Sequence, residues 1–187
     1  MAYTMGVVVG ILVTIAAMVL IVFAIFKLGN KDGRVKTEYD ERQKIVIGEG
    51  YKYAFWTLAA LLVVLQIAVE LERDFSEASI IQSSLGPLTF ALIIVSILVF
   101  CVYSIWNGAY WGLNSNKKNY IIIIAVIGVV NVFIGVAAIM SDGLVVNGAL
   151  SGAFVNLTCG LLMAVVLGIA WIKDRIDKAS DNEEGDE

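Results

Sequence analysis

The chain has 187 residues, of which 59% are hydrophobic and 16% charged, and its formal net charge is −4. This composition excludes an ordinary soluble domain, in which about 45–50% of residues are apolar and about 25% are charged. The chain contains no His, which removes the commonest metal ligand and the usual proton shuttle near neutral pH.

Long apolar runs define the predicted elements. A helix needs about 20 apolar residues to cross roughly 30 Å of hydrocarbon. Five runs meet this length, at about 5–28, 53–71, 87–107, 120–140 and 148–172. Together they occupy well over half of the chain, which leaves no room for a separate soluble domain. The sequence therefore predicts an all-α fold, an integral membrane five-helix bundle that forms one domain over residues 1–179.

The positions of the cations predict the orientation of this bundle. The first run follows an uncharged start, residues 1–4, and a basic cluster comes after it. Twelve of the thirteen Lys and Arg residues fall in alternate polar segments, and basic loops stay in the cytoplasm. We therefore expect the N-terminus outside, a cytoplasmic loop over 29–52, and the C-terminus in the cytoplasm. All four Trp residues and several Tyr lie near the expected cytoplasmic ends, as in an interfacial anchor belt.

The loop 29–52 is the largest expected aqueous segment. Glu38 precedes Arg42 by four residues and Asp40 precedes Lys44 by four, which is the favourable order for ion pairs on a helix. These pairs predict a short helix over 38–47 that lies at the membrane interface. Gly48 and Gly50 would then form a hinge into the second spanning helix.

A motif in this loop carries a resemblance. The stretch Asp40-Glu41-Arg42-Gln43, followed by Gly48 and by Tyr51-Lys52-Tyr53, resembles a feature of small uncharacterised multi-pass membrane proteins of Gram-positive bacteria. The resemblance covers about 20 of the 187 residues. It implies a bacterial origin, a place in the plasma (inner) membrane, and a cytoplasmic loop that docks onto a protein partner. The alternative is a charge-paired helix that only caps the bundle.

Polar residues within the apolar runs share a similar depth. Counted inward from the expected outer ends, most lie eight or nine residues deep and one lies about five deep, which places them roughly 8–14 Å below the outer interface. They are Thr14, Gln66, Ser96, Asn131 and Asn156. Polar groups inside a membrane usually face the bundle interior or a cavity. Two interpretations remain: polar contacts between helices, or a small polar cavity open to the outside.

The last two runs also contain small residues at helical spacing. Such residues let two helices approach closely in lipid. Because the two runs are joined by a short loop, we expect antiparallel packing and a hydrogen bond between Asn131 and Asn156. After the last run, residues 180–187 are rich in Asp and Glu, and we expect a disordered acidic tail.

These features favour a non-catalytic protein. We expect no catalytic residues, no cofactor and no metal site, because the chain lacks His, and Cys101 and Cys159 lie in apolar runs without a neighbouring base. The first hypothesis is an interaction or regulatory subunit that acts through its cytoplasmic loop. The alternative is a small transporter, channel subunit or binder of a lipid or small molecule. Expected partners are membrane lipids, a cytoplasmic protein and a second copy of the chain, and not nucleic acid.

Overall fold

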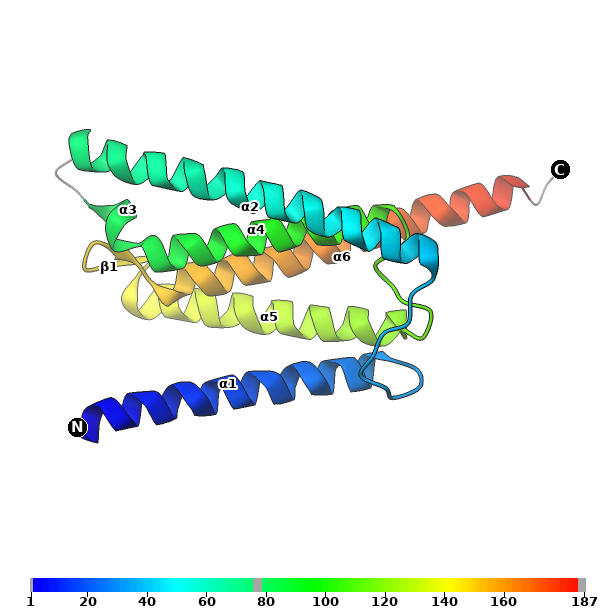
Figure 1. Cartoon of the computed structure of the whole chain (residues 1–187), viewed down its shortest axis with the longest axis horizontal. Coiled ribbons are helices and arrows are strands. Elements are labelled where there is room, and N and C mark those ends of the chain that lie inside the picture. Colours follow the sequence, from blue (N-terminus) through cyan, green and yellow to red (C-terminus); the bar gives the residue numbers. More distant parts are fainter. Residues whose placement is uncertain (1, 76–78, 185–187) are drawn as a thin grey trace.

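Helices make up nearly all of the structure. The computed structural model describes residues 2–75 and 79–184, with the side chains of 2–12, 14, 15 and 181–184 outside the description. In these residues the elements are α1 (Ala2–Gly29), α2 (Glu41–Phe75), α3 (Ile80–Ser83), α4 (Leu85–Trp106), α5 (Lys117–Asp142), β1 (Val145–Val146), β2 (Ala149–Leu150) and α6 (Gly152–Glu184) (Figure 1). The predicted all-α class is therefore confirmed.

Four of these helices are long and apolar enough to cross a membrane within the described part of the chain: α2, α4, α5 and α6. The stretch 16–29 of α1 is also an apolar helix, shorter than those four. The helices pack in the order α1, α5, α6, α4, α2, so that α1 and α2 form the two edges (Figure 1).

The core lies where α4, α5 and α6 meet. It consists of the buried residues Cys101, Ile105, Ile124, Leu162, Val166 and Ala170. Glycines bring α5 and α6 together: a Cβ at Gly135 would lie 2.9 Å from Leu157, and one at Gly160 would lie 3.2 Å from the Val132 nitrogen. Small residues at an interface allow this close approach, as the sequence predicted.

Three boundaries differ from prediction. Helix α2 runs without a break from Glu41 to Phe75, so the separate helix over 38–47 with a hinge at Gly48 and Gly50 is wrong. The fifth apolar run becomes helical only at Gly152, because Asn147 and Gly148 have φ of 51° and 76° and turn a β-hairpin. Helix α6 continues to Glu184, so residues 180–184 of the expected disordered tail are helical; residues 185–187 lie outside the described residues.

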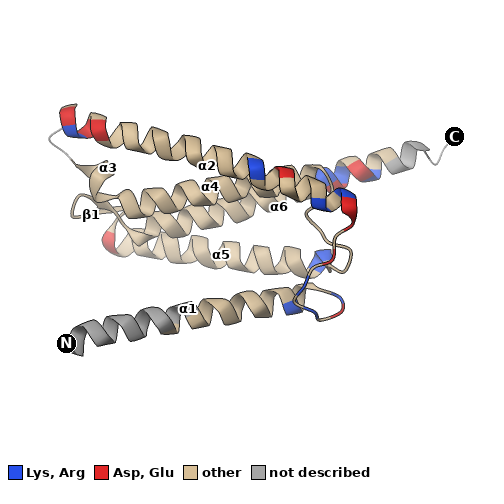
Figure 2. Cartoon of the chain, in the orientation of Figure 1, with Lys and Arg blue, Asp and Glu red and all other residues tan. Residues whose placement is uncertain are grey.

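Charges gather at the two ends of the bundle (Figure 2). We call the end with the connections 30–40 and 107–116 the basic end. Of the thirteen Lys and Arg residues, all but Arg73 lie in these connections or in the parts of the helices nearer to this end. The acidic end carries Glu70, Glu72, Asp74 and Asp142 together with Arg73, next to α3 and the hairpin. This segregation matches the charge pattern from which the orientation was predicted.

Candidate functional site

The predicted docking motif begins α2 as an N-terminal cap. The Asp40 carboxylate accepts a hydrogen bond from the Gln43 amide nitrogen at 2.6 Å, and Gln43 Oε1 accepts one from the Asp40 nitrogen at 3.2 Å. These reciprocal bonds are those of a capping box, which satisfies backbone donors that a helix start leaves free. The cap ends the extended chain at Asp40 and fixes the direction in which α2 enters the bundle.

The same motif also holds the connection 107–116. Gln43 Nε2 donates to the carbonyl oxygens of Gly108 and Trp111 at 3.3 and 3.1 Å, and the Gln43 side chain is buried, with 9% of the residue exposed. Arg42 Nη2 donates to the Asn107 carbonyl at 3.3 Å. Gln43 is therefore engaged inside the protein, whereas Glu41 and Arg42 remain exposed on the surface.

Asn114 joins the two connections from the other side. Its Oδ1 accepts from the Glu38 nitrogen at 2.9 Å, and its Nδ2 donates to the Lys36 carbonyl at 3.0 Å and to the Asp32 carboxylate at 3.2 Å. The Arg34 backbone N–H and this amide hold the pKa of Asp32 below its usual value, because both donate to the charged carboxylate. The connections 30–40 and 107–116 thus fold as one unit.

Close contacts tie α1 to this unit. The Asn116 nitrogen donates to the Gly29 carbonyl at 2.8 Å, and Tyr120 Oη donates to Asn30 Oδ1 at 3.2 Å. A Cβ at Gly29 would collide with the Tyr120 ring, so any other residue there would displace this ring. Farther along α1, the described side chains from Ala16 to Leu28 are exposed, apart from the half-buried Ile25. Helix α1 is therefore anchored by its last turn.

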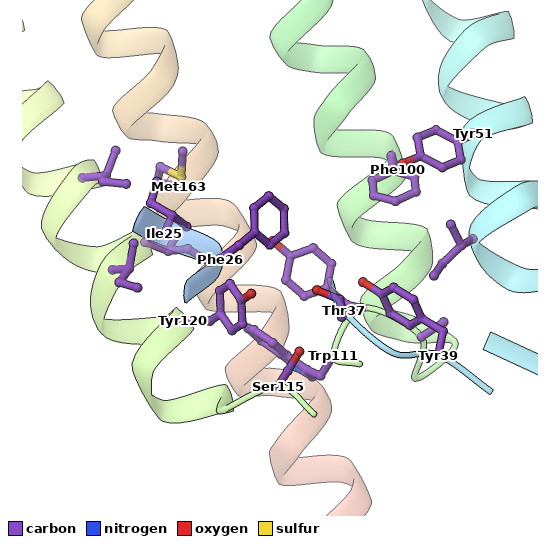
Figure 3. A pocket seen from close by; sticks show the side chains of 16 residues that line it. Ile25, Phe26, Thr37, Tyr39, Tyr51, Phe100, Trp111, Ser115, Tyr120 and Met163 are labelled. Atoms are coloured by element: carbon purple, nitrogen blue, oxygen red, sulfur yellow. The ribbon is translucent and has the colours of Figure 1, made fainter. Parts of the chain in front are cut away.

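A cavity of about 420 Å³ lies between these connections and the helices (Figure 3). All five long helices contribute to its wall. Its lining residues are Ile25, Phe26, Thr37, Tyr39, Ile47, Tyr51, Phe100, Ala109, Tyr110, Trp111, Ser115, Tyr120, Ile123, Ile124, Ile127 and Met163. Seven of these sixteen are aromatic, and none carries a formal charge. Along α5, lining residues extend from Tyr120 to Ile127, seven positions apart, which corresponds to about 10 Å.

Aromatic contacts shape the wall of this cavity. The Tyr51 and Phe100 rings stack with centroids 4.6 Å apart, Trp111 meets Tyr110 edge to face at 4.7 Å, and Trp111 lies 6.1 Å from Tyr120. The alternation of half-buried and exposed residues over 35–40 directs Thr37 and Tyr39 inward and Lys36 and Glu38 outward. The wall thus combines flat apolar faces with a few hydroxyl groups.

Two phenols in the connections remain protonated at neutral pH. Burial raises the pKa of Tyr39 and of Tyr110 above the usual value for tyrosine, because the phenolate would lose its hydration. Both hydroxyl groups are therefore uncharged polar groups in the wall of the cavity. A cavity with apolar walls and a few polar groups is the usual form of a small-molecule site.

The predicted polar layer is not part of this cavity. Its described members bond within their own helices: Ser96 Oγ to the Ile93 carbonyl, Asn131 Nδ2 to that of Ile127, Asn156 Nδ2 to that of Gly152, and Gln66 Nε2 to Glu70 Oε1. The predicted bond between Asn131 and Asn156 is wrong, because each amide donates one turn back along its own helix. The Thr14 side chain lies outside the described residues.

The sequence predicts a membrane anchor belt for the Trp and Tyr residues. Trp56, Trp106 and Trp171 are exposed, at 63%, 53% and 61%, as expected for an interfacial belt. Trp111 instead lines the cavity and lies under the Lys117 ammonium, which is 5.8 Å from its ring centroid and paired with Asp174. Uncharged and charged residues alternate over 35–40, and this pattern is a sequence signal that could have identified Thr37 and Tyr39 as inward-facing.

Comparison of the chain with protein-family models, with curated proteins and with solved structures gave no match.

Proposed function

We propose that this protein is a non-catalytic, multi-pass membrane protein that binds an apolar or amphipathic small molecule in the aromatic cavity. The observation that carries the proposal is the cavity itself. Its wall contains residues from all five long helices and from both connections of the basic end. Its volume lies within the range of about 300–1,000 Å³ that small-molecule sites occupy. Its uncharged lining favours a ligand whose inserted part is also uncharged, because an unpaired buried charge is costly.

The orientation in the membrane belongs to the same proposal. We take α1 as the fifth span, with the basic end in the cytoplasm and the acidic end outside, in the plasma membrane of a bacterium. Support comes from the concentration of Lys and Arg at one end and from the exposed Trp56, Trp106 and Trp171. In this orientation the cavity opens at the depth of the cytoplasmic leaflet.

The proposal can be tested by fluorescence of Trp111. Replacement of Trp56, Trp106 and Trp171 by Phe leaves Trp111 as the single tryptophan, and it lines the cavity. This variant in detergent micelles is titrated with methyl dibromostearate, a neutral long-chain ester whose bromine atoms quench tryptophan. We expect saturable quenching, which requires a discrete site. Quenching that rises linearly with ester would show only partitioning into the micelle and would overturn the proposal.

A matched pair of variants locates the site. Ile127→Phe fills the deep end of the cavity, whereas Ile122→Phe makes the same change at an exposed position of the same helix. We expect saturable quenching to disappear only in Ile127→Phe. Ile25→Phe fills the side next to α1 and provides a second test if Ile127→Phe does not fold. Binding that survives both filling changes would place the ligand elsewhere.

A cytoplasmic protein partner remains a second candidate, supported by two exposed features. Glu41 and Arg42 are exposed at the start of α2, and α6 continues past the bundle with Trp171, Ile172 and Ile176 exposed (Figure 1). Crosslinking in membranes, with Arg42→Ala compared against Ile176→Ser, tests which feature a partner contacts. A crosslinked set that neither change alters would remove this candidate.

A further inference from the structure

We infer that the ligand of the aromatic cavity is a single-chain amphiphile with an anionic headgroup, and that Lys44 binds this headgroup. The inference rests on the proposed function, since it assigns a chemical class to the ligand of the same cavity. Its two parts, the chain and the headgroup, are supported by different residues.

The inner part of the cavity suits one hydrocarbon chain. Ile123, Ile124 and Ile127 follow one another along α5 in its wall. Met163 and the stacked Tyr51 and Phe100 rings lie farther from the connections than Tyr39 and Trp111 (Figure 3). A volume of about 420 Å³ is near the lower end of the range for drug-sized ligands, which leaves no room for the two chains of a phospholipid. The chain would extend from the basic end toward the middle of the bundle.

The residue that binds the headgroup is inferred from the face of α2 that lines the cavity. Ile47 and Tyr51 line it, and Lys44 stands three and seven residues before them, which places it on the same helix face. Lys44 lies one turn nearer the helix start and therefore nearer the aqueous end. A lysine at this position can lay its apolar stem along the wall and keep its ammonium at the mouth of the cavity.

Neighbouring acids do not neutralise Lys44 in the described part of the chain. Asp40, four residues earlier, accepts the Gln43 nitrogen in the helix cap. Glu49 lies on another face of α2 and accepts a hydrogen bond from Tyr103. None of the ion pairs among the described residues involves Lys44, whereas Lys117, the cation above Trp111, is already paired with Asp174. Lys44 is thus the cation available to an anion at this face.

Aromatic cavities also attract organic cations, which makes a quaternary ammonium ligand the main competitor. One observation favours the anion. The sixteen lining residues include no carboxylate that could balance a buried cation. A carboxylate or phosphate ester would instead form a charge-assisted hydrogen bond with Lys44.

The test compares three brominated probes that share one chain: dibromostearate, its methyl ester and the matching trimethylammonium compound. Each is titrated against the variant with Trp111 as its single tryptophan. We expect dibromostearate to bind about tenfold more tightly than the ester, as one charge-assisted hydrogen bond would give. Lys44→Gln should abolish this difference without changing binding of the ester. Lys52→Gln, a change at another exposed cation of α2, should preserve it.

The outcomes separate the two proposals. Saturable quenching by the ester together with equal affinity for the carboxylate overturns the anionic headgroup but leaves the proposed function standing. If the trimethylammonium probe bound more tightly than the other two probes, the anionic headgroup would also be overturned. Absence of saturable quenching by all three probes removes the proposed function itself. Equal saturable quenching by dibrominated phosphatidylglycerol in mixed micelles would overturn the single-chain assignment.

Discussion

The two ends of the bundle reverse the chain by different means. At the acidic end, the Glu72 carboxylate accepts the backbone nitrogens of Ile81 and Gln82 at 2.8 and 2.9 Å, and Ser84 Oγ accepts that of Leu150 at 2.8 Å. At the basic end, Gln43 and Asn114 join two longer connections over several bonds each. The cavity occurs at the basic end, where the connections fold over the helices instead of only turning between them.

This difference implies that side-chain bonds of the basic end support the cavity, whereas those of the acidic end support only the chain reversal. Substitutions at the two ends should therefore separate overall stability from the environment of Trp111. Each variant below is measured by thermal and denaturant unfolding in detergent, and by the fluorescence of the variant with Trp111 as its single tryptophan.

The largest loss is expected for Gly112→Ala at the basic end. A Cβ at this position would lie 2.7 Å from the Glu38 carbonyl oxygen and would also collide with the Thr37 methyl group. Because a backbone oxygen cannot move without separating the connections, we expect a loss of about 2–3 kcal/mol in the free energy of unfolding. Gly86→Ala at the acidic end is the control, since nothing lies within 4 Å of its Cβ. Equal stability of the two variants would contradict the tight packing of the connections.

Gln43→Ala should have the next largest effect. It leaves the carbonyls of Gly108 and Trp111 without the side chain that bonds both of them and removes half of the capping box, at a cost of about 2 kcal/mol. The emission maximum of Trp111 should shift as well, because the connection 107–116 loses its bonds to Gln43. Gln66→Ala, at an exposed glutamine bonded only to Glu70 within α2, should change stability by less than about 0.5 kcal/mol. An unchanged Trp111 signal in Gln43→Ala would show that the motif does not hold the cavity.

Ser84→Ala tests the acidic end alone. The Ser84 hydroxyl is fully buried, and its loss leaves the Leu150 nitrogen without a partner, which should cost about 1–2 kcal/mol. Trp111 fluorescence and ester binding should stay unchanged, because the cavity lies at the other end. The exposed Ser83→Ala serves as the matched control. A loss of ester binding in Ser84→Ala would show that the two ends are coupled.

The helices could be predicted from the sequence, but the contacts between the two connections could not. Apolar length predicted α1, α4 and α5 to within about three residues at each end. Helix α2 begins 12 residues before the predicted run and α6 ends 12 residues after it, because polar turns extend both helices. The capping role of Asp40 and Gln43 could also be found, since an acid followed three residues later by Gln is a known helix start. Only the fold, however, places Gly108 and Trp111, 65 and 68 residues away, against Gln43.

The polar layer shows a second limit. Depth counting placed Asn131 and Asn156 at one level, but a depth does not state which way an amide points. The side-chain nitrogen of each Asn can donate a hydrogen bond to a carbonyl oxygen of the preceding turn. This bond within the helix competes with a bond between helices. The close approach of α5 and α6 at Gly128, Gly135 and Gly160 then leaves packing, and not hydrogen bonding, as their contact.

The smallest expected effects concern two glycines of α2 that the sequence suggested as a hinge. Nothing lies within 4 Å of a Cβ at Gly48, whereas one at Gly50 would lie 3.0 Å from the Phe100 ring and 3.3 Å from Ser104 Oγ. In an uninterrupted helix, Gly48→Ala should raise the free energy of unfolding by about 0.5–1 kcal/mol, because alanine loses less backbone entropy. Gly50→Ala should lower it by about 1 kcal/mol, since Phe100 must move and disturb its stack with Tyr51.

Opposite signs at two positions of one helix cannot come from helix propensity alone, so the pair isolates the contact of α2 with α4. A flexible hinge predicts a different result, namely destabilisation or loss of ligand binding in both variants. Because Tyr51 lines the cavity beside Ile47, Gly50→Ala should also weaken saturable quenching by the ester, whereas Gly48→Ala should leave it intact. The start of α2 would then act as a rigid wall of the site, whose position depends on how closely Gly50 lets it approach Phe100.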